Sequence, residues 1–171
     1  MTDAQTEFGS SEYAKEILGT VWGYPPTLDL KQEAALQKAL IEMIDAGWIE
    51  SAHDCSEGGI AVTLAESSLP QSIGVKVEIA SQRLPAEFAL FGEDASRVVL
   101  SCDRAHVEGI QQVARKHGIS AEVIGETVAG PVEISLDGKV VVSATVAELR
   151  EVYEGALEAV LKTDPELVAA D

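Results

Sequence analysis

The chain is poor in cysteine. Its 171 residues include only two, Cys55 and Cys102. Two isolated cysteines supply neither the disulfide framework of a small secreted domain nor the paired spacing of a zinc site. We therefore expect both thiols to be free and buried, in a protein of a reducing compartment.

Basic residues are also scarce. Twelve Lys and Arg stand against 29 Asp and Glu, a formal net charge of −17. Such a surface repels polyanions at long range, which argues against a nucleic-acid partner and against docking to an anionic membrane. A phosphate-bearing ligand would have to be held locally, by backbone N–H groups, a single arginine or a bridging Mg²⁺.

Long apolar runs are missing. No stretch approaches the roughly 20 apolar residues that span a bilayer, and the first residues do not resemble a signal peptide. We expect a cytoplasmic protein.

With 46% hydrophobic residues the chain has material for one packed core. We predict a flexible leader over 1–9, a single domain over 10–162 and a flexible tail over 163–171.

Helix and strand signals alternate along the chain. Helices are predicted over 10–19, 28–47, 57–69, part of 83–96, 103–118 and 145–162, and strands over 48–55, 73–79, 97–102, 120–128 and 131–143. The strand over 48–55 is expected to be buried. The last strand segment is expected to fold as a hairpin, because Asp137 and Gly138 suit the two φ > 0 positions of a type I′ turn. This order predicts an α/β (α+β) layered domain, with a mixed β-sheet packed against helices.

Capping signals mark several helix starts. Asp29 and Gln32 have capping-box spacing, and so do Thr145 and Glu148. Ser56 is expected to be the N-cap of the helix that follows it.

The last predicted helix has the clearest apolar side in the chain. That side is formed by Leu149, Val152, Tyr153, Ala156, Leu157 and Val160. Trp22 and Trp48 flank the second helix, and we expect them to be core or interface anchors.

The stretch SAHDCSEGGIAVTLAESS, at 51–68, places an acid, a histidine and two glycines before an apolar run. Gly58 and Gly59 leave the first N–H groups of a helix free of side chains, and these donors, with the helix dipole, suit a phosphate. Asp54 is a candidate ligand for a Mg²⁺ that bridges phosphate oxygens. His53 is placed to donate to a phosphate or to move a proton.

A plainer interpretation of the same stretch is architectural. Both glycines would then only let the helix pack close to the strand, and His53 would be a buried structural residue. A Cys-His nucleophile is disfavoured, because His53 and Asp54 face opposite sides of a strand and no third group is evident beside Cys55.

A second cluster, FGEDASR at 91–97, contains Glu93, Asp94 and Arg97 just before a predicted strand. It is either a solvated acidic loop with Arg97 in a salt bridge, or a carboxylate–guanidinium pair that lines a pocket together with the first cluster.

These motifs resemble those of phosphoribosylformylglycinamidine synthase, the ATP-dependent ligase of purine biosynthesis. SAHDCSEGGIAVTLAES is similar to the family's His-Asp-x-Ser-x-Gly-Gly-Leu-Ala-x-x-Leu-Ala-Glu signature. LFGEDASRVVLS is similar to its Phe-Gly-Glu-x-x-x-Arg-x-x-x-Ser stretch, and GSSEYAKEILG with PPTLDL to its Gly-Ser-Glu-Tyr segment and Pro-Pro connector. The resemblance covers about residues 9–160, and within the family it is to the C-terminal domain of the second half of the enzyme.

The resemblance implies a fold like the C-terminal domain of aminoimidazole ribonucleotide synthetase. It also implies a phosphate or nucleotide pocket with no catalytic residue of its own, in which Asp54 is the candidate metal ligand. The implied pocket residues are His53, Asp54, Ser56, Gly58, Gly59, Glu93 and Arg97.

In that family the parent enzyme uses ATP, which becomes ADP, and Mg²⁺ to turn formylglycinamide ribonucleotide into its amidine with ammonia from glutamine. The implied partners are the N-terminal synthetase domains of the same enzyme, a glutaminase subunit or domain, and a small accessory subunit. The isolated chain is then expected to be inactive and to hold no cofactor tightly. Two alternatives stay open: another enzyme of the same fold, such as aminoimidazole ribonucleotide synthetase, selenophosphate synthetase or a hydrogenase-maturation protein, or a non-enzymatic acidic interaction module.

Overall fold

The computed structural model describes residues 9–163, and the predictions of a flexible leader and tail fall mostly outside them. The helices are α1 (Glu12–Glu16), α2 (Leu30–Asp45), α3 (Gly59–Ser68), α4 (Ala86–Phe91), η2 (Arg104–His106, a 3-10 helix), α5 (Val107–Lys116) and α6 (Val146–Thr163). The strands are β1 (Ser51–Asp54), β2 (Gly74–Ile79), β3 (Val98–Ser101), β4 (Gly125–Val128), β5 (Val132–Leu136) and β6 (Lys139–Ala144).

The strands form two sheets. Four of them make a mixed sheet in the order β4-β2-β5-β6, in which only the β2–β5 pair is parallel. The other two, β1 and β3, form an antiparallel ribbon in which His53 pairs with Val99 and Asp54 with Val98. The predicted α/β layered fold with a mixed sheet is therefore confirmed.

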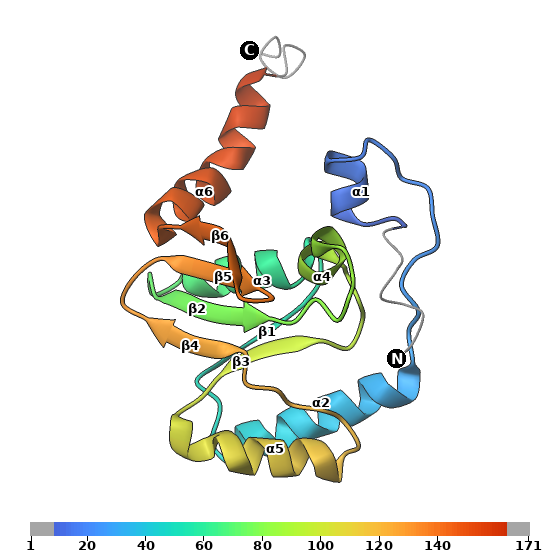
Figure 1. Cartoon of the computed structure of the whole chain (residues 1–171), viewed down its shortest axis with the longest axis vertical. Helices are drawn as coiled ribbons and strands as arrows, with labels where there is room; N and C mark the ends of the chain where they lie inside the picture. Colours follow the sequence, from blue (N-terminus) through green and yellow to red (C-terminus); the bar gives the residue numbers. More distant parts are fainter. Residues whose placement is uncertain (1–8, 164–171) are drawn as a thin grey trace.

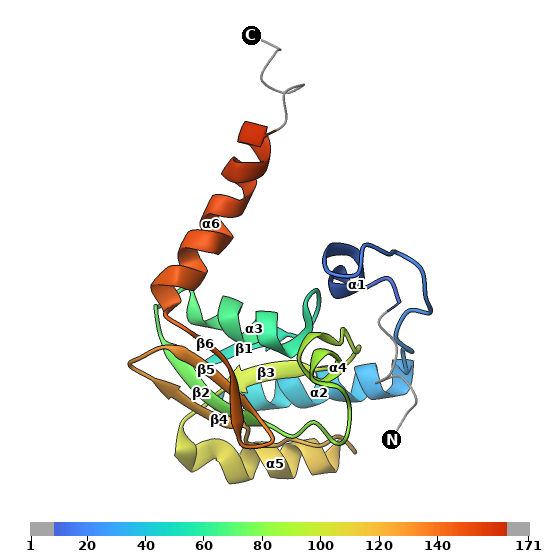
Figure 2. The ribbon, with the colours of Figure 1, turned by 45° about the horizontal axis from the view of Figure 1, so that its top comes forward.

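Helices cover the strands from two sides. In Figures 1 and 2, α2 and α5 lie together on one side of the strands, and α3 and α4 lie on the other. The larger core cluster joins α3, α4 and the four-stranded sheet, with Leu64, Ile134 and Val132 among its most buried side chains. A smaller cluster, centred on Ala39, Met43 and Ala114, holds α2 against α5.

Most local signals in the sequence are confirmed. The Asp29 side chain accepts hydrogen bonds from the backbone N–H groups of Lys31 and Gln32 at the start of α2. The Thr145 hydroxyl accepts from the Glu148 backbone N–H, and the Glu148 carboxylate accepts from the Thr145 N–H, as a capping box requires.

The β5–β6 hairpin is also confirmed. Asp137 and Gly138 have φ of 49° and 79°, the left-handed values that a type I′ turn needs.

The predicted buried strand over 48–55 is wrong in length and burial. The ladder covers only Ser51–Asp54, and most of that strand is exposed. The apolar residues that favoured burial, Trp48 and Ile49, lie before the strand and pack into the smaller core cluster.

The prediction of Ser56 as N-cap is also wrong. Helix α3 begins at Gly59, and its N-cap is Gly58, at φ 77° and without a side-chain cap. Glu57 and Gly58 separate Ser56 from the helix, and the carbonyl of Ser56 accepts from the Gly59 N–H instead.

Of the two thiols, Cys55 is buried as predicted, whereas Cys102 is half-buried. Within the described residues, no helix is both long enough and apolar enough to cross a membrane.

Candidate functional site

The corner between β1 and α3 places the residues that the sequence singled out. Gly58 and Gly59, at φ 77° and 63°, turn the chain from the strand into the helix. Only glycine adopts two such successive conformations readily, because a Cβ clashes with the backbone in the left-handed region. The turn sets the start of α3 directly beside α4.

Gly59 also permits a close approach between the two helices. A Cβ built on Gly59 would lie 2.7 Å from the Gly92 carbonyl oxygen and 2.9 Å from that of Leu90. Real Cβ atoms do not come so close to backbone atoms. This contact supports the architectural interpretation of the glycine pair.

The phosphate interpretation required free N–H groups at the helix start. The structure contradicts this for Gly58, whose N–H donates to a side chain of the protein itself. One carboxylate oxygen of Glu93, Oε1, accepts from the Gly58 N–H at 2.8 Å and from the Glu12 N–H at 2.9 Å. Glu12 is the first residue of α1, so this oxygen lies where two helix N-termini meet. Glu93 therefore supplies the negative charge that the helix start favours.

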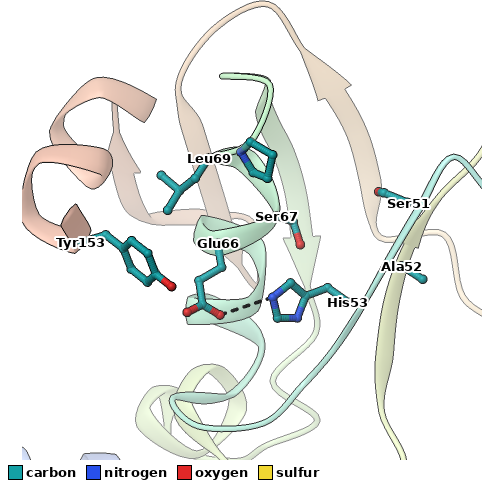
Figure 3. Close-up of a pocket in the computed structure, with 8 residues that line it drawn as sticks. Ser51, Ala52, His53, Glu66, Ser67, Leu69 and Tyr153 are labelled. Atoms are coloured by element: carbon teal, nitrogen blue, oxygen red, sulfur yellow. Dashed lines mark ion pairs between the residues drawn. The ribbon is translucent and has the colours of Figure 1, made fainter.

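His53 lines a cavity of about 520 Å³ beside α3 and α6. Figure 3 shows its ring pointing toward the Glu66 carboxylate, with Nε2 at 3.4 Å from Oε2. The other ring nitrogen, Nδ1, lies 2.8 Å from the carbonyl oxygen of Asp54. Both ring nitrogens thus face oxygen atoms. Tyr153 and Leu69 form the opposite wall.

Asp54 lines a different cavity, of about 230 Å³. Arg97 lies in its wall, and so do Glu33 and Ser96, whose hydroxyl donates to Glu33 Oε2 at 2.7 Å. His53 and Asp54 line separate cavities, although His53 Nδ1 lies 3.8 Å from Asp54 Oδ1. Of the seven predicted pocket residues, Ser56, Gly58, Gly59 and Glu93 line neither of these two cavities.

The loop before β3 is held by Arg97. Its guanidinium lies 3.6 Å from Asp94 Oδ2 and 3.5 Å from the carbonyl oxygen of Gly92. The Asp94 side chain is only 17% exposed, and burial raises the pKa of this carboxyl above its ordinary range, an effect that Arg97 partly offsets. The salt-bridge interpretation of Arg97 is confirmed, but the loop is half-buried rather than fully solvated.

Replacing Asp94 with asparagine is expected to change stability with pH in a defined direction. A carboxyl with a raised folded-state pKa contributes most stability below its ordinary pKa and loses it as pH rises. As pH rises from about 4 to 7, Asp94→Asn should therefore gain stability relative to the wild type and be the more stable of the two at pH 7. Urea unfolding of both proteins at the two pH values measures this difference. A variant that falls below the wild type at pH 7 would contradict the burial effect.

Asp137→Asn is the matched control, with the opposite sign. Hydrogen bonds from Ser81 lower the pKa of the Asp137 carboxyl. Its contribution is therefore present above its ordinary pKa and is lost on acidification. This variant should be less stable than the wild type at pH 7, and the difference should shrink toward acid.

The Cys55 thiol does not support nucleophilic chemistry. Burial raises its pKa above the ordinary range. A buried thiol with a raised pKa is protonated at neutral pH and reacts poorly. Within the described residues, no group of three or more His, Cys, Asp and Glu side chains is arranged to hold a metal ion.

Sequence reasoning missed Glu66, Tyr153 and Glu33. Glu66 is the last residue of the quoted signature, 13 positions after His53, so the motif itself contained the signal. Tyr153 was assigned to an apolar helix side, and Glu33 was not singled out at all. Only the packing of α6 and α2 against the body brings these two to the cavities.

Comparisons with known proteins agree on one family. Residues 4–137 match the model of the AIR synthase related protein, C-terminal domain. The phosphoribosylformylglycinamidine synthase subunit PurL of Thermobifida fusca is 39% identical over 157 residues, which cover 92% of this chain and 20% of that subunit. The chain thus spans about a fifth of the length of the curated relatives it matches.

Two solved structures have the same fold. The PurLQS structure from Thermotoga maritima has a TM-score of 0.69 at 19% identity, covering 82% of this chain and 24% of that one. The T. maritima PurL complexed with ATP has a TM-score of 0.65 at 19% identity, covering 82% and 23%. Together with the family match, these findings show that the chain belongs to the family of AIR synthase related protein C-terminal domains.

Proposed function

We propose that this chain acts as the C-terminal domain of a phosphoribosylformylglycinamidine synthase, an ATP-dependent C–N ligase. In the proposed parent reaction, ATP activates the formyl amide oxygen of formylglycinamide ribonucleotide. Ammonia from glutamine then replaces that oxygen, giving the amidine, ADP and phosphate. The observation that carries the proposal is the 39% identity to a PurL subunit across 92% of the chain.

Within that enzyme we assign the chain the role of a pocket wall. His53 with Glu66, and Asp54 with Arg97, stand on opposite sides of β1, where other domains would complete each cavity. The Gly58–Gly59 corner positions this strand.

The chain alone does not fit ATP or Mg²⁺. Glu93 already fills the helix start that a phosphate would use, and its negative charge would repel one. Asp54 offers a single exposed carboxylate, whereas Mg²⁺ prefers six ligands. ATP, ADP and Mg²⁺ would therefore be held mainly by domains outside this chain, with Asp54 contributing at most one ligand.

The proposed partners follow from the same assignment. They are the N-terminal synthetase domains, a glutaminase subunit or domain, and a small accessory subunit. The relative from T. maritima has been solved as a PurLQS assembly, which supports a multi-subunit partner set.

A chimera tests this function. The stretch of the T. fusca subunit that matches this chain would be replaced by this chain. The chimera should release ADP in a reaction that depends on ammonia and formylglycinamide ribonucleotide, whereas this chain alone should release none. A folded chimera without turnover would contradict the proposal and favour an acidic interaction module. Turnover by the isolated chain would contradict the division of roles.

The same chimera tests the pocket wall. His53→Ala and Asp54→Asn should each raise the KM for ATP or for the ribonucleotide at least fivefold. Glu50→Gln, at an exposed position next to the strand, is the matched control and should leave both KM values unchanged. Unaltered KM values in both site variants would remove these residues from the pocket.

A further inference from the structure

The apolar side of α6 is buried at one end of the helix and bare along the rest. Val146 is buried in the larger core cluster, and Leu149 packs against it. Tyr153 and Leu157 continue along the same side of the helix, at the spacing of successive turns, but are 59% and 70% exposed. An apolar stripe that begins in the core and continues into solvent is typical of an interface that lacks its second half.

Contacts with the body fix the base of α6. The Arg150 guanidinium donates to the carbonyl oxygen of Leu69 and to the Ser72 hydroxyl, and the Thr145–Glu148 capping box holds the first turn. Beyond this base, α6 extends away from the sheets in both views (Figures 1 and 2). Its exposed side therefore has a set position on the molecule. We name Val152, Tyr153, Leu157 and Leu161 the α6 face.

A second group of exposed apolar side chains lies in residues 17–24, directly after α1. Trp22 is 86% exposed, and four other large apolar side chains around it are also exposed. We name this patch the Trp22 segment, which comprises Ile17, Leu18, Val21, Trp22 and Tyr24. Both views place α1, which leads into this segment, and α6 on the same side of the sheets (Figures 1 and 2).

The composition of these two patches is that of a protein interface. Trp and Tyr are the residues most enriched at binding hot spots, and each patch contains at least one of them. Isolated exposed apolar residues are common on protein surfaces, but nine within α6 and the segment 17–24 are not.

We propose that the α6 face and the Trp22 segment together dock another part of the intact synthase, one that presents an apolar surface flanked by Lys and Arg. The proposal rests on the proposed function. The chain spans only about a fifth of the length of its curated relatives, so four fifths of such a protein are available to cover the surface.

Charge selects this occupant over a second copy of the chain. Each copy carries a formal charge of −17, and α6 itself contains four glutamates against two basic residues. Both basic residues, Arg150 and Lys162, already pair with glutamates of the same helix. Two α6 faces brought together would therefore meet like charges, whereas basic flanks on a partner would complement them.

Hydroxyl-radical footprinting of the T. fusca chimera tests the docking. Trp22 and Tyr153 should be oxidised at least fivefold more slowly in the chimera than in the isolated chain. Ile44, an exposed residue of α2 outside the proposed surface, should be oxidised equally fast in both. In the chimera, Leu157→Ser should restore most of the Trp22 oxidation rate, whereas the matched variant Ile44→Ser should not.

The outcomes separate this inference from the proposed function. An active chimera with Trp22 oxidised as fast as in the isolated chain would overturn the docking and leave the function standing. A folded, inactive chimera with Trp22 protected would contradict the function and support the docking. Sedimentation of the isolated chain as a dimer that Leu157→Ser dissociates would overturn the choice of occupant.

Discussion

Gly59→Ala is expected to destabilise the domain by about 2–5 kcal/mol. A non-glycine residue at φ 63° costs about 1–2 kcal/mol. The new Cβ would lie 2.7 Å from the Gly92 carbonyl oxygen, and forcing the backbones of α3 and α4 apart costs about 1–3 kcal/mol more. Urea unfolding at neutral pH measures the total.

Gly118→Ala separates the two contributions. Gly118 follows the C-cap residue of α5 at φ 75°, and no neighbouring atom lies within 4 Å of the position of its Cβ. This control should therefore lose only the conformational part, about 1–2 kcal/mol. If both variants lose the same free energy of unfolding, the close approach of α3 and α4 contributes nothing to the cost of Gly59→Ala, and our account of the corner is wrong.

Glu93→Ala is expected to cost about 2–4 kcal/mol, and to act at two places far apart in the sequence. It leaves the N–H groups of Gly58 and Glu12 without the carboxylate that accepts from both. A partly buried donor that loses its partner costs about 1–3 kcal/mol. The helix starts of α1 and α3 should loosen together, because one oxygen serves both.

Amide hydrogen exchange provides the decisive measurement for Glu93. Exchange at Gly58 and Glu12 should speed up together in Glu93→Ala, whereas exchange in the core strand β5 should change only through global stability. Glu93→Gln keeps an oxygen acceptor without the charge, so it should lie between the wild type and the alanine variant. Unchanged exchange at both amides would show that the carboxylate does not hold these helix starts.

The Glu93 contact changes the interpretation of the signature motif. From the sequence, two glycines at a helix start allowed either a phosphate site or a close-packed corner. The structure favours the close-packed corner for two reasons. The Gly58 N–H already donates to the Glu93 carboxylate, and Gly59 packs closely against α4. Polar side chains that line the two cavities include His53, Glu66, Asp54 and Arg97.

Features of the fold that depend on neighbours in the sequence could be predicted. The capping residue Asp29, the Thr145–Glu148 box and the Asp137–Gly138 turn all form contacts within about four residues of the chain. Such contacts are set by local geometry, so residue type and spacing suffice. The same holds for the alternation of β2, whose buried and exposed residues follow period two.

Contacts between distant segments could not be predicted. Glu93 and Gly58 are 35 positions apart, and Glu93 and Glu12 are 81 apart. The Ser56 prediction failed because a serine before a helix is only a local signal. The left-handed turn at Gly58 and Gly59 is instead required by the close packing of α3 on α4, which the sequence does not show.

By itself, the sequence determined the acidic charge of −17, the order of helices and strands, and the motifs that resemble the synthase family. The tertiary structure alone decided which cavity each residue of β1 lines and which carboxylate accepts from the N–H at the helix start. It also decided that the apolar side of α6 is buried only as far as Leu149. The physical reason is range. Periodicity and capping act over a few residues, whereas burial and charge pairing depend on segments that meet only when the chain has folded.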